Sequence, residues 1–264
     1  MTLDTHKKFN YWNMVTEPIR PSTHDLHTFR SMIRAEDVRS ILILGVTPEL
    51  IDLAITESIE HIAVVDIRGH AFEDLKIHAS KDWESVEFIH SDWRANVPHF
   101  AAAFNLILGH GSFVHLEYPD WWIKTLDLLN LYLINNGKIV LRTFFRPNRA
   151  IDFRIFFQDN VDTIIELSND YSLSNAHSFA KLTTLLKLHA LINSIRINGT
   201  IDQAALEANI TWLFDQVERA IGSSDLWKVF ASEFEGATPN EYAPQIGQSY
   251  LRRRELSDFA HSGR

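Results

Sequence analysis

The first half of the chain alternates short unbroken apolar runs with longer runs in which apolar residues recur at helical spacing. The short runs predict strands at 41–45, 62–66, 86–90, 104–109 and 138–145. The longer runs predict helices at roughly 48–59, 70–79 and 119–134. Alternating strands and helices require a parallel sheet with right-handed crossovers, so we expect a doubly wound, mainly parallel, Rossmann-like α/β sheet.

The pattern changes after residue 145. The segment 151–221 contains no convincing strand, and its clearest amphipathic runs predict helices over 176–197 and 201–221. The second helix has Thr200 as its candidate N-cap and Gly222 just beyond its end. We therefore expect a helical insertion after the fifth strand, either a lid that recognises substrate or an added cover for the sheet.

Composition restricts the class of protein. The 264 residues carry a formal charge of −9 and include no cysteine, which argues against a general nucleic-acid binder and excludes thiolate chemistry. No apolar run reaches the ~18–20 residues of a membrane span, and the first residues lack the apolar core of a secretion signal. We expect a cytoplasmic protein with a small-molecule partner, no nucleic-acid partner and no membrane partner.

The thirteen histidines invite a metal hypothesis. The nearest approach to a ligand spacing is His24 with His27, but no acid-rich cluster lies on a matching face. We therefore expect no metal site.

The turn after the first predicted strand carries candidate chemistry. Gly45 permits a sharp turn, Thr47 can cap the next helix, and Glu49 complements the dipole in its first turn. Asp66 ends the second strand, where a doubly wound sheet places a carboxylate that can bind the two ribose hydroxyls. With one glycine and no following lysine, this turn would not hold phosphates, so it favours a nucleoside-bearing cofactor without a pyrophosphate.

The next strand ends extend this hypothesis. Asp92 follows the third strand and could accept a hydrogen bond from an adenine amino group, while Trp93 could stack on the ring. The fourth strand ends in Gly-His-Gly-Ser at 109–112. Such a turn permits close backbone approach and presents one titratable side chain, His110.

These motifs together resemble those of the class I S-adenosylmethionine-dependent methyltransferases, in particular a branch that acts on small molecules. The resemblance covers roughly residues 10–145. It rests on Leu-Gly-Val-Thr-Pro-Glu at 44–49, Ser-Asp-Trp-Arg at 91–94, Gly-His-Gly-Ser at 109–112 and the strand at 137–144. It implies methyl transfer from S-adenosylmethionine to a small molecule. The chain shows no internal repeat and no low-complexity linker, so we expect 1–264 to form one domain. Within it, 1–40 would be an N-terminal helical cap and 41–145 the cofactor-binding core.

The resemblance also implies roles for individual residues. The candidate cofactor contacts are Gly45, Val46, Thr47, Glu49, Asp66, Ile67, Asp92, Trp93, His110, Gly111 and Ser112. Arg20 could pair with a carboxylate of the cofactor or acceptor, or form a salt bridge with Glu17. His110 is the candidate catalytic base and Tyr11 a second one, although both could equally be packing or binding residues.

Two positions keep other functions open. Ile43 and His110 stand where many members of this family carry acids. A changed contact to the amino-acid part of the cofactor could favour an enzyme that cyclises or cleaves S-adenosylmethionine and releases methylthioadenosine. A non-catalytic cofactor-binding accessory protein and, more distantly, an NAD-dependent oxidoreductase are further alternatives. The exposed face of the helical insertion could also pair with a second copy, giving a homodimer.

Overall fold

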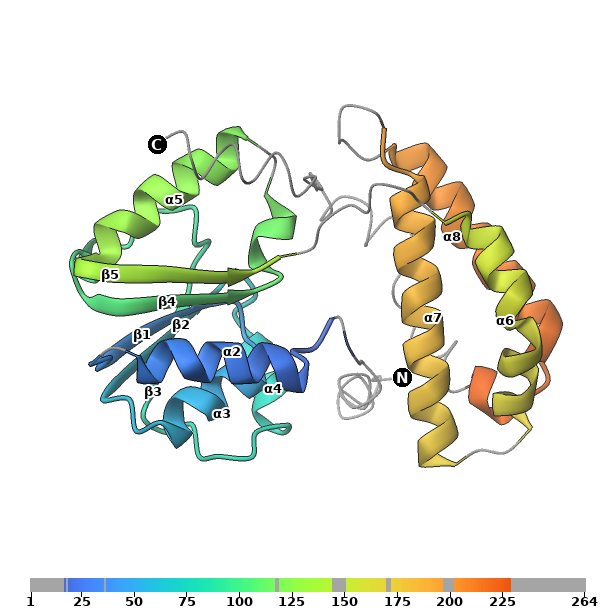
Figure 1. Cartoon of the computed structure of the whole chain (residues 1–264), viewed down its shortest axis with the longest axis horizontal. Helices are drawn as coiled ribbons and strands as arrows, with labels where there is room; N and C mark the ends of the chain where they lie inside the picture. Colours follow the sequence, from blue (N-terminus) through green and yellow to red (C-terminus); the bar gives the residue numbers. More distant parts are fainter. Residues whose placement is uncertain are drawn as a thin grey trace, which may run out of the picture. The chain divides into compact units, whose positions relative to one another are not determined.

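The computed structural model describes residues 17, 19–35, 37–116, 119–143, 151–169, 172–196 and 202–228. The chain divides into two compact units, one of residues 17–143 and one of residues 144–264 with 1–16. We describe each unit by itself (Figure 1). Tyr11 and the tail after 228 lie outside the described residues, so predictions about them stay untested.

The first unit is built on a five-stranded sheet in which every pair of neighbouring strands is parallel, in the order β3-β2-β1-β4-β5. The strands are β1 (Ser40–Leu44), β2 (His61–Asp66), β3 (Val86–His90), β4 (Phe104–His110) and β5 (Leu133–Arg142). The direction in which strands are added reverses between β1 and β4. The predicted parallel, Rossmann-like α/β fold is confirmed.

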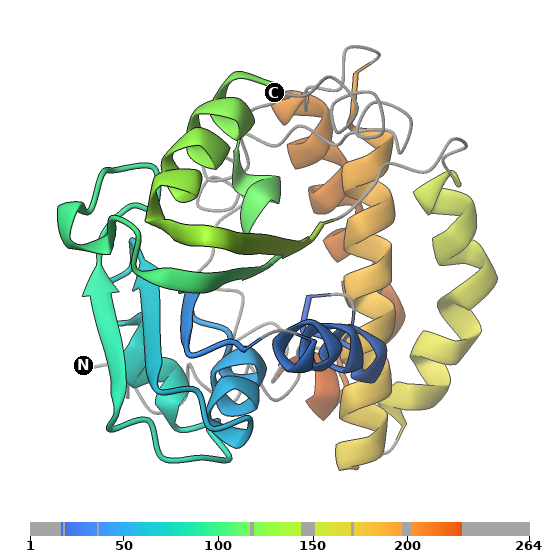
Figure 2. The same cartoon turned by 60° about the vertical axis from the view of Figure 1, so that its left-hand side comes forward.

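Helices cover both faces of this sheet. They are α2 (Thr23–Arg34), α3 (Pro48–Thr56), α4 (Ala71–Lys76) and α5 (Asp120–Tyr132). Figures 1 and 2 show α5 on one face and α3 and α4 on the other, as right-handed crossovers require. The strand β1 lies between these layers and is fully enclosed, since its side chains at 41–44 are at most 1% exposed. Its unbroken apolar run is therefore explained by burial on both faces.

The junction between α5 and β5 differs from the prediction. The sequence predicts a helix to about 134, followed by Asn136-Gly137 as its stop, and a strand from 138. In the structure the helix ends at Tyr132 and β5 begins at the next residue. Asn136 has a left-handed φ of 66° inside the strand, where the ladder to β4 shifts register. Asn-Gly thus permits a bulge in β5 rather than a helix stop.

The second unit contains three packed helices, α6 (Phe153–Ser168), α7 (Leu173–Asn193) and α8 (Gln203–Ile221). Phe179 and Leu186 are fully buried in their shared core. Asp202, rather than the predicted Thr200, caps α8 because its carboxylate accepts a hydrogen bond from the Ala205 N–H at 3.1 Å. None of the helices in the described part of the chain is long and apolar enough to cross a membrane.

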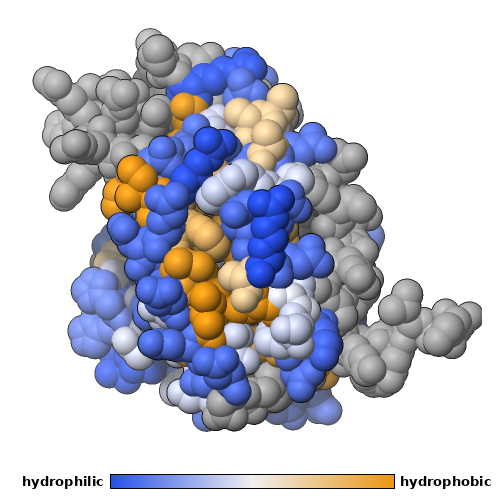
Figure 3. All heavy atoms as spheres, turned by 90° about the vertical axis from the view of Figure 1, so that its right-hand side faces the viewer, coloured by the Kyte–Doolittle hydropathy of each residue, from blue (hydrophilic) through white to orange (hydrophobic). Residues whose placement is uncertain are grey.

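The outer face of this unit carries scattered apolar side chains. Ile155 and Ile165 of α6 are 55% and 39% exposed. Figure 3 shows apolar side chains on this face between hydrophilic ones. A homodimer through this face stays a prediction.

Candidate functional site

The carboxyl ends of β1 and β2 bring several predicted site residues together. Gly45 follows β1 with a φ of 86°, a conformation that side chains disfavour. A Cβ atom at this position would lie 3.5 Å from the Trp93 ring and 3.8 Å from Asp66 Oδ2. The turn, the carboxylate and the indole therefore meet at the strand ends next to the point where the strand order reverses.

Asp66 supports the turn after β1. Its side chain is 5% exposed, and its Oδ2 accepts the Val46 N–H at 3.1 Å while Oδ1 accepts the Arg68 N–H at 2.8 Å. The Arg68 guanidinium folds back and lies 3.4 Å from both oxygens. Ile67 points outward, with 57% of its surface exposed. Asp66 therefore lies at the predicted ribose position, but the Arg68 guanidinium occupies the side of the carboxylate where the ribose would bind.

Asp92 repeats this arrangement at the end of β3. Its carboxylate accepts the backbone N–H of Arg94 at 2.9 Å and the guanidinium Nε at 2.9 and 2.8 Å. Hydrogen bonds from Arg94 lower the pKa of Asp92, although partial burial opposes them. The Arg94 guanidinium also lies 5.3 Å from the centre of the Trp121 ring. We call 66–68 and 92–94 the two Asp-x-Arg turns.

Glu49 and Arg20, both predicted cofactor contacts, pair with each other. Arg20 Nε donates to Glu49 Oε1 at 2.6 Å. Glu49 Oε2 is buried and has no hydrogen-bond partner among the described residues. Thr47 occupies the N-cap position of α3, but its side chain makes no capping hydrogen bond, so that capping prediction was wrong.

The turn after β4 is tied to both neighbouring strands. Gly111 has a φ of 70°, and its N–H donates to the Arg142 carbonyl at 2.9 Å. The Ser112 hydroxyl is buried and donates to the Leu44 carbonyl at 2.6 Å. Ser112 therefore holds the turn against β1 with its hydroxyl, leaving His110 as the side chain of this turn with unused hydrogen-bonding capacity.

His110 lies beside two charged residues that the sequence analysis did not combine with it. Its side chain is 2% exposed, and its Nε2 is 3.9 Å from Asp25 Oδ2. Arg142 Nε lies 3.8 Å from Asp25 Oδ1. Burial, followed by the charge of Arg142, lowers the pKa of His110 to about 4. The imidazole is therefore neutral at pH 7.

Asp25 reaches this place because of how α2 begins. Ser22 caps the helix, and Asp25 accepts the Ser22 N–H and hydroxyl at 2.9 and 2.8 Å. A Ser-x-x-Asp spacing is a readable helix start, but the sequence offers no sign that this start lies against the fourth strand. Asp25 is thus a site residue that the sequence analysis missed.

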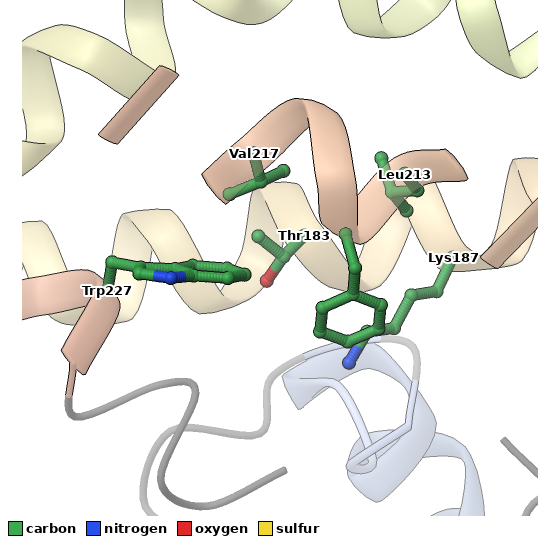
Figure 4. Close-up of a pocket in the computed structure, with 6 residues that line it drawn as sticks. Thr183, Lys187, Leu213, Val217 and Trp227 are labelled. Carbon is green, nitrogen blue, oxygen red and sulfur yellow. The ribbon is translucent and has the colours of Figure 1, made fainter. Parts of the chain in front are cut away.

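A shallow hollow in the helical unit is a separate feature (Figure 4). Thr183 and Lys187 of α7 line it together with residues of α8 and with Trp227. Burial lowers the pKa of Lys187 to about 7, and its ammonium lies 5.4 Å from the centre of the Phe214 ring. The volume of about 10 Å³ has room for about one water molecule. It is too small for a nucleoside.

Comparisons with known proteins agree with the fold. No family model and no curated protein matches the chain. A structure from Rhodobacter sphaeroides, provisionally described as a Zn-dependent alcohol dehydrogenase, aligns over 97% of this chain and 86% of its own, with 12% identity and a TM-score of 0.52. The fold is Rossmann-like. At this identity the likeness shows the fold alone.

Methyltransferases also occur among the similar structures. The sugar N-methyltransferase KedS8 from Streptoalloteichus sp ATCC 53650 aligns over 49% of this chain with 13% identity and a TM-score of 0.41. The chain spans about half of that protein, 51%. The N-methyltransferase NodS from Bradyrhizobium japonicum, in complex with S-adenosyl-L-homocysteine, aligns over 53% of this chain and 72% of its own, with 16% identity and a TM-score of 0.39. These scores are too low to carry a functional argument.

Proposed function

We propose that the chain binds S-adenosylmethionine at the carboxyl edge of its sheet and transfers the methyl group to a small molecule. The observation that carries this proposal is the meeting of Gly45, Asp66 and the Trp93 ring at the ends of β1 and β2. A buried carboxylate beside a left-handed glycine and an aromatic ring suits a ribose and an adenine. The single glycine and the acid of this turn disfavour a pyrophosphate.

Binding is an exchange of partners in this proposal. The ribose hydroxyls take the place of the Arg68 guanidinium on Asp66, and the adenine amino group takes the place of Arg94 on Asp92. Glu49 and Arg20 present one negative and one positive group, which complement the ammonium and the carboxylate of the methionine part. The buried Oε2 of Glu49 would gain a hydrogen-bond donor.

The methyl group moves by in-line displacement at the sulfonium carbon. The protein contributes by aligning the acceptor with the methyl group and by excluding water from the reacting atoms. His110 lies at the end of β4 within the same edge, so it is the side chain assigned to the acceptor.

The first experiment measures cofactor binding and its fate. Calorimetric titration with S-adenosylhomocysteine should show a single site, and NAD should not bind. Incubation with S-adenosylmethionine alone, followed by mass spectrometry of the nucleosides, should leave the cofactor intact until an acceptor is supplied. Release of methylthioadenosine would instead favour intramolecular chemistry, and absence of binding would overturn the proposal. A bound cofactor that no acceptor panel consumes would favour the accessory-protein alternative.

Arg94→Gln should tighten the binding of S-adenosylhomocysteine. The variant removes the group that competes with adenine for Asp92, and breaking a partly exposed pair of this kind costs about 0.2–1 kcal/mol. We expect a dissociation constant lower by up to about fivefold in calorimetry. Arg39→Gln, which alters an exposed pair with Asp37 at the other end of β1, serves as the matched control. Weaker binding by Arg94→Gln would show that Arg94 contacts the ligand instead.

A further inference from the structure

Two hydrogen-bond acceptors face each other at the end of β4. His110 Nε2 and Asp25 Oδ2 are 3.9 Å apart, which is too far for a direct hydrogen bond. A hydrogen bond from the His110 ring to its own backbone carbonyl contributes to the pKa of His110. Because Nε2 has no partner among the described residues, we assign this bond to Nδ1–H of the neutral imidazole. Nε2 therefore presents a lone pair, and it is buried without a hydrogen-bond partner among the described residues.

The Asp25 carboxylate is ionised and has acceptor capacity left. Burial raises the pKa of Asp25, but hydrogen bonds from Ser22 and the charges of Arg142 and His110 outweigh it and lower the value overall. Ser22 donates to Oδ2, whereas Oδ1 faces Arg142 at 3.8 Å, beyond hydrogen-bond distance. Asp25 and Arg142 keep 18% and 23% of their side chains exposed, so a ligand can approach the carboxylate.

A donor with two hydrogens fits this pair best. A primary amine can donate one N–H to His110 Nε2 and the other to the Asp25 carboxylate, and its lone pair remains available for attack. A hydroxyl has only one hydrogen and would leave one of the two acceptors unsatisfied. The amine must be neutral in this complex, because only the neutral form keeps a lone pair for attack. Arg142 lies beside two acids, Asp25 and Glu17.

We infer that His110 and Asp25 form an amine subsite and that the methyl acceptor of the proposed function carries a primary amino group. The amine nitrogen forms a bond to the methyl carbon as the carbon–sulfur bond breaks, and the bonding pair returns to sulfur to leave a thioether. The positive charge moves from sulfur to a secondary ammonium group beside Asp25. An alkyl amine loses one proton to solvent before it binds in the neutral form, and the product leaves as a secondary ammonium ion that keeps both N–H protons. The transfer step itself therefore needs no base.

The protonation behaviour of His110 supports an amine over a hydroxyl acceptor. A hydroxyl must lose its proton during transfer, which calls for a base with a pKa near the working pH. His110, with a pKa of about 4, is a weak proton acceptor at pH 7 but a good hydrogen-bond acceptor. The charged groups that face it are Asp25 of α2 and Arg142 of β5.

The test uses two probes that differ only in the donor group. The full-length protein, labelled with nitrogen-15 in histidine and saturated with S-adenosylhomocysteine, is titrated with 2,2,2-trifluoroethylamine or 2,2,2-trifluoroethanol. The fluorines keep the amine neutral at pH 7, and His110→Gln identifies the Nε2 signal. We expect the amine, at millimolar concentrations, to shift the His110 Nε2 signal more than the alcohol does at the same concentration, because only the amine can donate to both acceptors.

The variant Asp25→Asn distinguishes specific binding of the amine to the Asp25 carboxylate from nonspecific occupation of a cavity. The variant keeps an oxygen for the Ser22 N–H, so the helix cap survives, but it should bind the amine about tenfold more weakly because a charge-assisted hydrogen bond is lost. Asp37→Asn, which removes an acid that is 83% exposed, should bind like wild type. Equal shifts with both probes, unchanged amine binding by Asp25→Asn, or no shift with the amine would overturn the subsite.

This inference rests on the proposed function, but the two fail in different ways. Loss of S-adenosylhomocysteine binding in the calorimeter would overturn the cofactor assignment whatever His110 does. A normal calorimetric titration together with a silent His110 signal would overturn the amine subsite alone.

Discussion

Asp66→Ala is expected to abolish measurable binding of S-adenosylhomocysteine and to destabilise the unit that contains the sheet. In the proposed complex Asp66 accepts two ribose hydroxyls, each a hydrogen bond to a charged group worth about 1.5–3 kcal/mol. Losing both predicts at least about a hundredfold weaker binding. The same change leaves the Val46 and Arg68 N–H groups without their acceptor. The buried Val46 N–H costs about 1–3 kcal/mol, and the Arg68 N–H, which belongs to an exposed residue, costs less.

The two effects can be separated by experiment. Calorimetry reports the affinity, and denaturant unfolding followed by circular dichroism reports the stability, expected to fall by about 1–3 kcal/mol. Asp66→Asn keeps one oxygen for a backbone N–H and should recover part of the stability but little of the affinity. Asp37→Ala, an exposed acid far along the same unit's surface, controls for loss of charge. Near-wild-type affinity in Asp66→Ala would remove this carboxylate from the binding site.

The second large effect is a loss of stability in acid that depends on His110. The folded state holds the imidazole neutral with a pKa of about 4, compared with 6.5 in the unfolded chain. The unfolded state therefore binds a proton first, and the stability that His110 contributes is complete above pH 6.5 and declines as pH falls towards 4. The size of the shift corresponds to about 3 kcal/mol over this interval.

Unfolding measurements at intervals between pH 7 and pH 4 test this directly. His110→Gln should lose about 3 kcal/mol less than wild type across the interval, because glutamine has no proton to take up. His70→Gln, in which the replaced side chain is 77% exposed, should follow the wild-type profile. Identical profiles for wild type and His110→Gln would mean that His110 titrates in the fold as it does in the unfolded chain.

The elements of the sheet were predictable because their signals are local. The unbroken apolar run at 41–44 predicts a strand that is covered on both faces of the sheet, and the burial of these side chains confirms it. The start of β5 was predicted wrongly because Asn136 and Gly137 are residue types that often end a helix. Here Asn136 adopts its left-handed conformation within a bulge of β5. That choice depends on pairing with β4, which a local pattern does not contain.

The sequence could predict which strand ends form the candidate site, but it could not predict the partners of the side chains there. The parallel topology brings Gly45 and Asp66 together at one edge, as the sequence indicated. The partners of these residues were not predictable. Arg20, just before α2, reaches Glu49, and Asp25 in the first turn of α2 approaches His110, and this part of the chain precedes the sheet. Contacts of this kind are set by the path of the chain in space. The assignments to cofactor and acceptor stay predictions.

The two Asp-x-Arg turns have a consequence for how salt should act on the protein. S-adenosylhomocysteine carries no net charge near neutral pH, so direct Coulomb attraction contributes little to its association. Each turn nevertheless holds an internal ion pair, with guanidinium groups 59% and 40% exposed, that the nucleoside must displace. Screening at higher ionic strength weakens exposed pairs of this kind. Added salt should therefore strengthen nucleoside binding, opposite to the behaviour of a site that captures its ligand by charge.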